Sequence, residues 1–303
     1  MIAVLCPGQG AQTPGMLSPW LEIPAVAERL ATLSEAAGVD IVHHGTESDA
    51  DTIRDTAIAQ PLLVATAIAT GRELLGDAIP ALAAGHSVGE LGAAALAGVL
   101  TDAEAMRLVA VRGAAMARAA AAGEPTSMAA VLGGVADEVA EALASRGLTP
   151  ANVNGAGQVV AAGSTGAIES LVAEPPARAR VVQLQVAGAF HTATMLPAVA
   201  DLEAAAASST PADPAGTLLS NADGAPVADG ADALARIVRQ VANPVRWDLC
   251  MDAMLGAGVT GIIEVAPGGV LTGLAKRAMK GVPAVALKTP DDLAAARDLL
   301  ETR

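Results

Sequence analysis

A five-residue segment, Gly85–Gly89 (Gly-His-Ser-Val-Gly), lies between a short apolar run and a stretch of small residues. The run at Ala81–Ala84 is typical of a buried strand, and Leu91–Gly98 is suited to a buried helix. Glycines at both ends of the segment permit a strand-to-helix turn without Cβ clashes. G-x-S-x-G in this setting predicts a nucleophile elbow, which lifts the hydroxyl of Ser87 out of an α/β sheet. An ordinary Gly/Ser turn is the alternative.

Alternating apolar runs and helix-forming segments predict the fold of most of the chain. Strands are predicted at Ile2–Cys6, Ala81–Ala84, Thr217–Ser220, Thr260–Val265 and Ala284–Leu287, and helices at 61–75, Leu91–Gly98, Asp102–Ala120, 195–208, 231–241, 247–256, Val270–Met279 and after Thr289. Such alternation favours a parallel sheet covered by helices on both faces. The predicted class is therefore α/β, with a parallel-sheet core.

The middle of the chain has a different order of elements. Strand, helix, two strands, helix and strand are predicted at Ser127–Leu132, Asp137–Ser145, Ala151–Val153 with Gln158–Ala162, 165–173 and Arg180–Val186. This βαββαβ order is typical of a ferredoxin-like unit. We therefore expect a small subdomain at 122–187, inserted into a core that consists of residues 1–121 and 188–303.

Composition excludes several classes of function. The 303 residues include one Phe, two Trp and no Tyr, and the net charge is -14, so a nucleic-acid binder is not expected. Cys6 and Cys250 are too far apart in sequence for a C-x-x-C pair, and neither a disulfide framework nor a metal site is predicted. The start, Met1–Cys6, lacks the basic region of a signal peptide, and no segment resembles a bilayer span. We expect a cytoplasmic protein that does not bind membranes.

A serine nucleophile needs a base, and the chain has four histidines. His43 and His44 lie in a polar stretch, and His86 is expected to diverge from Ser87 at the sharp turn. His191 follows a predicted strand, so it would lie at the edge where α/β sheets place their sites. A hydrogen-bonded loop histidine is the alternative for His191.

Two further segments are candidates for binding. The loop Pro7–Gln12 follows the first strand but fails the dinucleotide pattern at Thr13, so it is either a backbone loop at a reacting centre or a plain turn. Arg112 stands among small apolar residues, which indicates a buried cation that needs a partner. From the sequence alone, an ion pair with an acidic side chain is slightly favoured over an anionic substrate.

Asp223 suggests a rival site. Asp223-Gly224-Ala225 matches half of a patatin-type Ser–Asp dyad. The consecutive glycines of the oxyanion loop that such a dyad requires are not found.

Taken together, these segments resemble the malonyl-CoA:acyl-carrier-protein transacylase family of type II fatty acid synthesis. The matching segments are Gly8–Gly10, Gln60-Pro61, Gly85–Glu90, Arg112-Gly113 with Met116, Gly188–His191, Gln240 with Asn243–Val245, Glu264-Val265 with Pro267-Gly268, and Leu271–Leu274. The resemblance implies an α/β hydrolase-like core with a ferredoxin-like insertion. It also implies an acyltransferase that moves malonyl from malonyl-CoA to the phosphopantetheine thiol of acyl carrier protein through a malonyl-serine, with no cofactor.

The resemblance implies a role for individual residues at the reacting centre. Ser87 would be the nucleophile and His191 its general base, oriented by the carbonyl oxygen of Gln240. The backbone N–H groups of Gln9 and Val88 would form the oxyanion hole.

It also implies a role for residues that contact the acyl group. Arg112 would clamp the malonyl carboxylate, in place of the internal ion pair. Met116 and Phe190 would contact the substrate, with Phe190 typical of malonyl-selective members.

Carrier protein is typically acidic, so its docking on an acidic chain requires a local basic patch. Lys276, Arg277 and Lys280 form the densest basic cluster in the sequence, and Lys276 and Lys280 would share one face of the predicted helix. A solvated helix face is the alternative for the cluster. For the whole chain, a serine hydrolase or thioesterase and a silent carrier-binding module are the rival functions.

Overall fold

Two sheets form the framework of the protein, of which a computed structural model describes residues 1–301. The strands are β1 (Ile2–Cys6), β2 (Leu82–Gly85), β3 (Thr126–Gly133), β4 (Thr149–Gly155), β5 (Gln158–Ser164), β6 (Ala179–Gln183), β7 (Thr217–Leu218), β8 (Val245–Arg246), β9 (Gly261–Glu264) and β10 (Ala284–Ala286). The α-helices are α1 (Pro24–Ala37), α2 (Ile41–Thr46), α3 (Thr56–Leu75), α4 (Gly89–Leu96), α5 (Asp102–Ala121), α6 (Ala136–Ala144), α7 (Thr165–Ala173), α8 (Leu196–Ala206), α9 (Gly230–Gln240), α10 (Trp247–Gly256), α11 (Val270–Ala278) and α12 (Leu293–Glu301).

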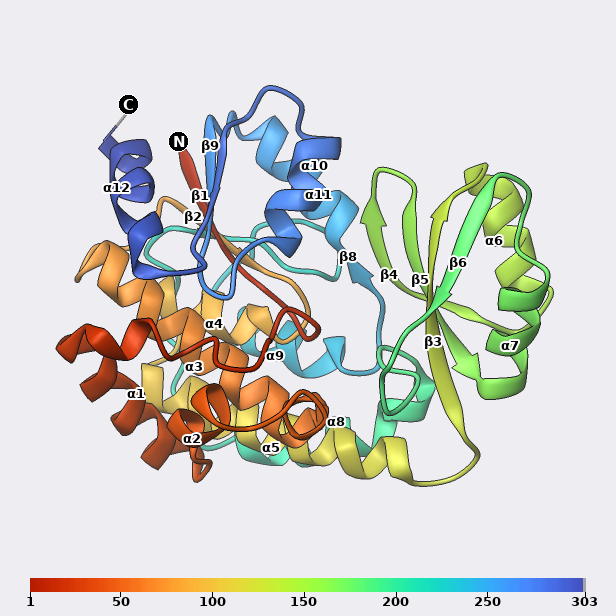
Figure 1. The fold of residues 1–303 in the computed structure, drawn as a ribbon, viewed down its shortest axis with the longest axis horizontal. Coiled ribbons are helices and arrows are strands. Elements are labelled where there is room, and N and C mark those ends of the chain that lie inside the picture. The colour runs from red at the N-terminus through yellow and green to blue at the C-terminus, as the bar shows by residue number, and fades with distance from the viewer. Residues whose placement is uncertain (302–303) are drawn as a thin grey trace.

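The first sheet is parallel, with the strand order β10-β9-β1-β2-β7. Successive residues of a strand point to opposite faces. Val4 and Cys6 of β1 accordingly pack in the core that α3, α4 and α5 share, whereas Ala3 and Leu5 pack on the side of α10 and α11 (Figure 1). Both faces are buried, as a parallel sheet requires.

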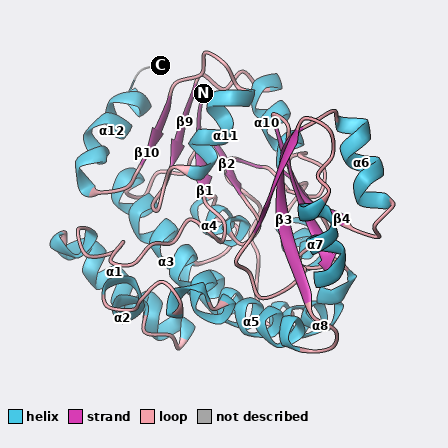
Figure 2. Ribbon diagram, turned by 45° about the vertical axis from the view of Figure 1, so that its right-hand side comes forward, coloured by secondary structure: helices cyan, strands magenta, loops and turns pink. Residues whose placement is uncertain are grey.

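The second sheet has the order β6-β3-β5-β4-β8, and the pairs β6–β3, β3–β5 and β5–β4 are antiparallel. Helices α6 and α7 pack against one face of this sheet, around Val131, Leu143 and Leu171 (Figure 2). The predicted α/β core with a small ferredoxin-like unit is confirmed. β8 comes from the later chain and pairs in parallel with β4, which the sequence did not predict because two residues give no apolar run.

Several elements differ from the sequence-based predictions. Helices α1 and α2 were not predicted. Helix α3 begins at Thr56, where Asp55 accepts the N–H of Ala57, so Pro61 lies inside the helix and not in its first turn. β6 ends at Gln183, three residues before the predicted end. The capping box of Thr101 and Glu104 is confirmed at the start of α5.

No helix within residues 1–301 combines the length and the apolar character needed to cross a membrane.

Candidate active site

The turn after β2 holds Ser87 in a backbone conformation that few non-glycine residues adopt. Its φ is 55°, in the left-handed region. The turn is tight because the neighbouring glycines leave no room for a side chain: a Cβ at Gly85 would overlap the backbone of Gly89, and one at Gly89 would overlap the carbonyl of Cys6. The predicted strand–turn–helix elbow is therefore formed, and Ser87 lies at its tip.

His191 lies directly against this serine. Its Nε2 is 2.7 Å from Ser87 Oγ, although the two residues are 104 positions apart. Its Nδ1 is 2.9 Å from the backbone oxygen of Gln240, which can only accept a hydrogen bond. Nδ1 therefore carries the hydrogen, and the unprotonated Nε2 faces the hydroxyl.

Burial determines the charge of His191. The ring is 3% exposed, and burial together with the nearby charge of Arg112 lowers its pKa to about 3. The imidazole is therefore neutral at neutral pH and able to accept the proton of Ser87. A backbone φ of 60° at His191 marks a second strained residue in the pair.

Arg112 approaches the same hydroxyl from α5. One guanidinium nitrogen lies 3.4 Å from Ser87 Oγ and 2.8 Å from the side-chain oxygen of Gln240, and the other donates to the side-chain oxygen of Gln60 at 2.7 Å. Within residues 1–301, Arg112 forms no salt bridge, so the internal ion pair that the sequence favoured is wrong. Two amide oxygens hold the side chain instead, and although burial lowers its pKa to about 10, it stays charged at neutral pH.

A polar layer lies behind the elbow. Ser87 donates its backbone N–H to Asn221 Oδ1 at 2.7 Å, and Asn221 Nδ2 donates to the carbonyl of Gly85 at 2.8 Å. Gln240 Nε2 donates to the carboxylate of Glu90, to the Ser87 carbonyl at 3.2 Å and to Asn221 Oδ1 at 3.1 Å. This layer fixes both ends of the turn and one partner of Arg112.

Two backbone N–H groups remain available next to Ser87. Val88 precedes the first residue of α4 with no side-chain cap, and Gln9 lies in the loop after β1. Within the described chain, neither N–H has a hydrogen-bond acceptor. The approach of the loop to the elbow is close, because a Cβ at Gly8 would lie 2.7 Å from the His86 carbonyl oxygen. Free amides at the start of a helix suit an oxyanion.

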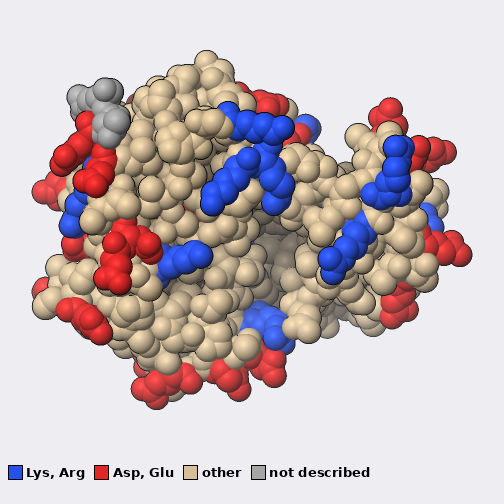
Figure 3. Space-filling model, turned by 45° about the horizontal axis from the view of Figure 1, so that its top comes forward, with Lys and Arg blue, Asp and Glu red and all other residues tan. Residues whose placement is uncertain are grey.

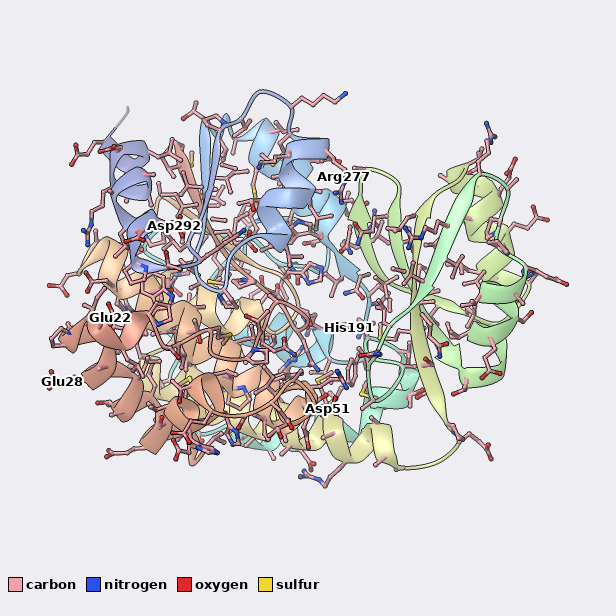
Figure 4. The ribbon with its side chains drawn as sticks, in the orientation of Figure 1. Glu22, Glu28, Asp51, His191, Arg277 and Asp292 are labelled. Carbon is pink, nitrogen blue, oxygen red and sulfur yellow. The ribbon has the colours of Figure 1, made fainter. Side chains whose placement is uncertain are left out.

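Ser87 and His191 open into a cavity of about 360 Å³ between the two sheets. Gln9, predicted for the oxyanion hole, and Met116 and Phe190, predicted as substrate contacts, line it, and Leu184–Val186 line it after leaving β6. Figure 4 shows His191 at the boundary between the core and the second sheet, with Arg277 above it and Asp51 below it in this view. The site thus lies between the parallel sheet and the inserted unit.

Three other sequence candidates lie apart from the serine–histidine pair. Asp223 forms an ion pair with Arg236 at 2.9 Å, so it does not serve as the base of a dyad. His86 turns away from Ser87 and bonds Asn154 of β4 at 2.9 Å. His43 is exposed, and His44 bonds Ser48 at 2.9 Å, so this histidine is part-buried and not fully solvated.

The basic cluster is exposed, but its helical spacing is not as predicted. Helix α11 ends at Ala278, and the turn that leads into Gly281, with φ of 88°, places Lys280 beyond the helix. Lys276 and Lys280 therefore do not share a helical face. Arg277 donates to Gln158 Oε1 at 2.9 Å, from α11 to the start of β5. Figure 3 shows Lys and Arg side chains gathered on both sides of the hollow between the two parts of the molecule.

Sequence reasoning missed three functional candidates. Gln60 and Glu90 were noticed only as members of motifs, and Asn221 was not noticed. A signal for Asn221 exists, because it directly follows the run Thr217–Ser220 and so lies at the carboxyl end of a parallel strand. Among residues 1–301, no group of three or more His, Cys, Asp or Glu side chains is placed to hold a metal ion.

Comparisons with known proteins identify the family of the chain. Residues 4–292 match the family described as the acyl transferase domain. A malonyl CoA-acyl carrier protein transacylase of Mycobacterium tuberculosis is 51% identical over 297 residues, which cover 97% of this chain and 98% of the relative.

Solved structures agree as well. The crystal structure of MCAT from Mycobacterium tuberculosis superimposes with a TM-score of 0.94 at 50% identity, covering 98% of this chain and 99% of the other. A malonyl-transacylase solved in complex with its type II PKS acyl-carrier protein gives a TM-score of 0.91 at 30% identity, with coverage of 98% and 99%. The chain therefore belongs to the acyl transferase domain family.

Proposed function

We propose that this protein transfers the malonyl group of malonyl-CoA to the phosphopantetheine thiol of acyl carrier protein, with Ser87 as nucleophile and His191 as base. The observation that carries the proposal is the pairing of Ser87 Oγ with His191 Nε2 at 2.7 Å beside a buried Arg112 that has no carboxylate partner among residues 1–301. The malonyl group is an acyl group that itself ends in a carboxylate. The names of the relatives support the same substrate and the same acceptor.

The first half of the reaction makes an ester on Ser87. Its hydroxyl oxygen attacks the thioester carbonyl while His191 Nε2 takes the hydroxyl proton. The negative charge of the tetrahedral intermediate falls on the former carbonyl oxygen, where the N–H groups of Gln9 and Val88 stabilise it. The carbon–sulfur bond then breaks, and the CoA thiolate leaves with the proton from His191.

The second half reverses these steps with a different thiol. The phosphopantetheine thiol gives its proton to His191 and attacks the malonyl ester, and Ser87 recovers the proton as its carbon–oxygen bond breaks. Arg112 would hold the malonyl carboxylate through both halves by charge-assisted hydrogen bonds. No cofactor takes part in this scheme, since the CoA thioester is itself a substrate.

Intact-protein mass spectrometry tests this proposal. Mixing the protein with malonyl-CoA is expected to give a covalent malonyl adduct that peptide mapping places on Ser87, and holo carrier protein is expected to discharge it. Release of the acyl group to water at the same rate with and without carrier protein would indicate a hydrolase. If no adduct forms, the result would favour the rival function, a catalytically silent module that binds carrier protein.

Two exposed lysines, Lys276 near the end of α11 and Lys280 just after it, give a prediction about the carrier protein. Lys276→Glu with Lys280→Glu is expected to raise the KM for carrier protein and to flatten its salt dependence, because acidic carrier protein loses a local positive partner. Acylation of Ser87 by malonyl-CoA is expected to stay near the parent rate. Steady-state kinetics at several salt concentrations measure both.

The control for this charge reversal is Arg29→Glu on α1, the helix that carries Glu28 at the far left of Figure 4. This substitution changes the charge away from the cavity. It is expected to leave both the KM for carrier protein and the rate of acylation by malonyl-CoA unchanged. Equal losses with CoA and carrier protein in the lysine variant would assign the cluster to the CoA phosphates or to stability. If the lysine variant loses activity with neither CoA nor carrier protein, the basic cluster is only a solvated surface.

A further inference from the structure

Glu90 is a buried carboxylate to which the scheme above assigns no role. It lies in the first turn of α4, three residues after Ser87, and is 3% exposed. Within residues 1–301, no Lys or Arg nitrogen lies within ion-pair distance of it. A buried carboxylate without a cation is unfavourable unless hydrogen bonds satisfy its oxygens. Its contacts therefore indicate what it does.

Both oxygens of Glu90 accept hydrogen bonds from the layer behind the elbow. Oε1 accepts the backbone N–H of Asn221 at 2.7 Å, and Oε2 accepts the side-chain Nε2 of Gln240. Neither contact is made to a group that itself reacts. Glu90 therefore acts on its neighbours only as a double acceptor.

Gln240 connects this carboxylate to the reacting groups. Its Nε2 faces three acceptors, namely the Glu90 carboxylate, the Ser87 carbonyl and Asn221 Oδ1, whereas its Oε1 accepts from Arg112 at 2.8 Å. This set of partners admits one orientation of the amide. The backbone oxygen of the same residue accepts from His191 Nδ1 at 2.9 Å.

We propose that the ionised carboxylate of Glu90 is a positioning residue for malonyl transfer: it holds the Gln240 amide with its oxygen toward Arg112, and so keeps the Arg112 guanidinium beside Ser87 for the malonyl carboxylate. The inference rests on the proposed function. Glu90 does not touch substrate, and its effect passes through Gln240.

Loss of the negative charge breaks this arrangement for a geometric reason. A glutamine at position 90 has one acceptor oxygen and one NH₂ donor, and a protonated carboxyl keeps one full acceptor oxygen beside a hydroxyl that donates its hydrogen and accepts only weakly. Asn221 N–H and Gln240 Nε2 are both donors, so one of them would then face a donor. Rotation of the Gln240 amide relieves that conflict only by turning its NH₂ toward Arg112, where donor again meets donor. The guanidinium then loses its partner and its position.

The environment of Glu90 places this change near neutral pH. Burial raises its pKa to about 7, against the lowering effects of the Asn221 N–H and of Arg112 on α5. The other groups that face it are Arg236 on α9 and the Cys250 thiol on α10, whose pKa burial raises far above its usual value. The arrangement is therefore complete above this pH and is lost as the pH falls through it.

Glu90→Gln tests the proposal on the intact enzyme. The ratio of malonyl to acetyl kcat/KM is expected to fall about 10–100-fold, the effect of misplacing a charged hydrogen-bond donor, while acetyl transfer stays within about threefold of the parent. Glu104→Gln makes the same substitution in the first turn of α5, outside the site, and is expected to leave the ratio unchanged. In an Arg112→Ala background, Glu90→Gln is expected to lower the ratio little further.

The pH profile separates positioning from a general loss of structure. In the unmodified enzyme the malonyl-to-acetyl ratio is expected to fall about tenfold from pH 8 to pH 6, following the ionisation of one group with a pKa near 7. Titration of the CoA phosphates cancels in the ratio, because both substrates carry them. In Glu90→Gln the ratio is expected to be low at every pH.

Three results would overturn this proposal. They are a parental ratio in Glu90→Gln, an unchanged pH dependence in that variant, or a flat ratio in the unmodified enzyme, which needs no variant to fold. Failure of the proposed function is a separate outcome, because the unmodified enzyme would then form no malonyl-Ser87 adduct at all.

Discussion

Ser87→Ala is expected to abolish the malonyl adduct completely. Neither thiol can take its place: Cys6 and Cys250 are buried, and burial raises the pKa of both thiols far above the usual value. Intact-protein mass after mixing with malonyl-CoA measures the result. An adduct formed at the parental rate would refute the assignment of Ser87 and make Cys6 the next residue to test.

His191→Ala belongs to the same test, because the histidine acts only through that hydroxyl. Acylation is expected to slow by about 10²–10⁴, the range for removing a general base. Because the pKa of His191 is lowered to about 3, the parent base is expected to remain neutral and active down to acidic pH. His43→Ala is the control, since His43 is exposed on α2 and lies away from Ser87. If His43→Ala slowed acylation as much as His191→Ala does, the result would contradict the pairing of His191 with Ser87.

Arg112→Ala is expected to reduce malonyl transfer far more than acetyl transfer. In the variant, malonyl loses its charge-assisted hydrogen bonds to the guanidinium. Acetyl has no carboxylate, so in the parent it leaves Arg112 buried without a charged partner, and the variant removes that unfavourable contact. The ratio of malonyl to acetyl kcat/KM is therefore expected to fall about 10–100-fold. Arg112→Lys is expected to restore it only partly, because an ammonium group cannot form the planar fork of a guanidinium.

Arg118→Ala provides the matched control for this variant. Arg118 lies on the same helix, but it is exposed and pairs with Asp201 at 2.9 Å. Its loss is expected to leave the ratio unchanged. A thermal melt of Arg112→Ala is needed beside the kinetics, because Gln60 and Gln240 lose their shared donor. An unchanged ratio in a folded Arg112→Ala would exclude the clamp.

The position of Glu90 explains why the binding of the malonyl carboxylate by Arg112 depends on other residues as well. Arg112 has no carboxylate partner within the described chain, yet it stays in place because two amide oxygens hold it. One of those amides is itself oriented by Glu90. The Arg112 guanidinium would thus already be oriented toward the malonyl carboxylate before the substrate binds, and it would have no other charged partner.

Local sequence was sufficient for the elements whose causes are local. The elbow follows from Gly85 and Gly89, which must approach other backbone too closely for a Cβ, and the start of α5 follows from the Thr101–Glu104 capping box. The βαββαβ order followed from the spacing of short apolar runs. Each of these depends on residues a few positions apart, so the pattern is visible without the fold.

Only the tertiary structure decided how distant polar groups pair. The sequence favoured an acidic partner for Arg112, but the fold brings Gln60 and Gln240 to it, from 52 and 128 positions away. It also brings Glu90 against Gln240, 150 positions away, and β8 against β4. A buried charge takes whichever donors and acceptors the packed elements place beside it, and that placement depends on the whole set of strand and helix contacts, not on the residues that flank the charge.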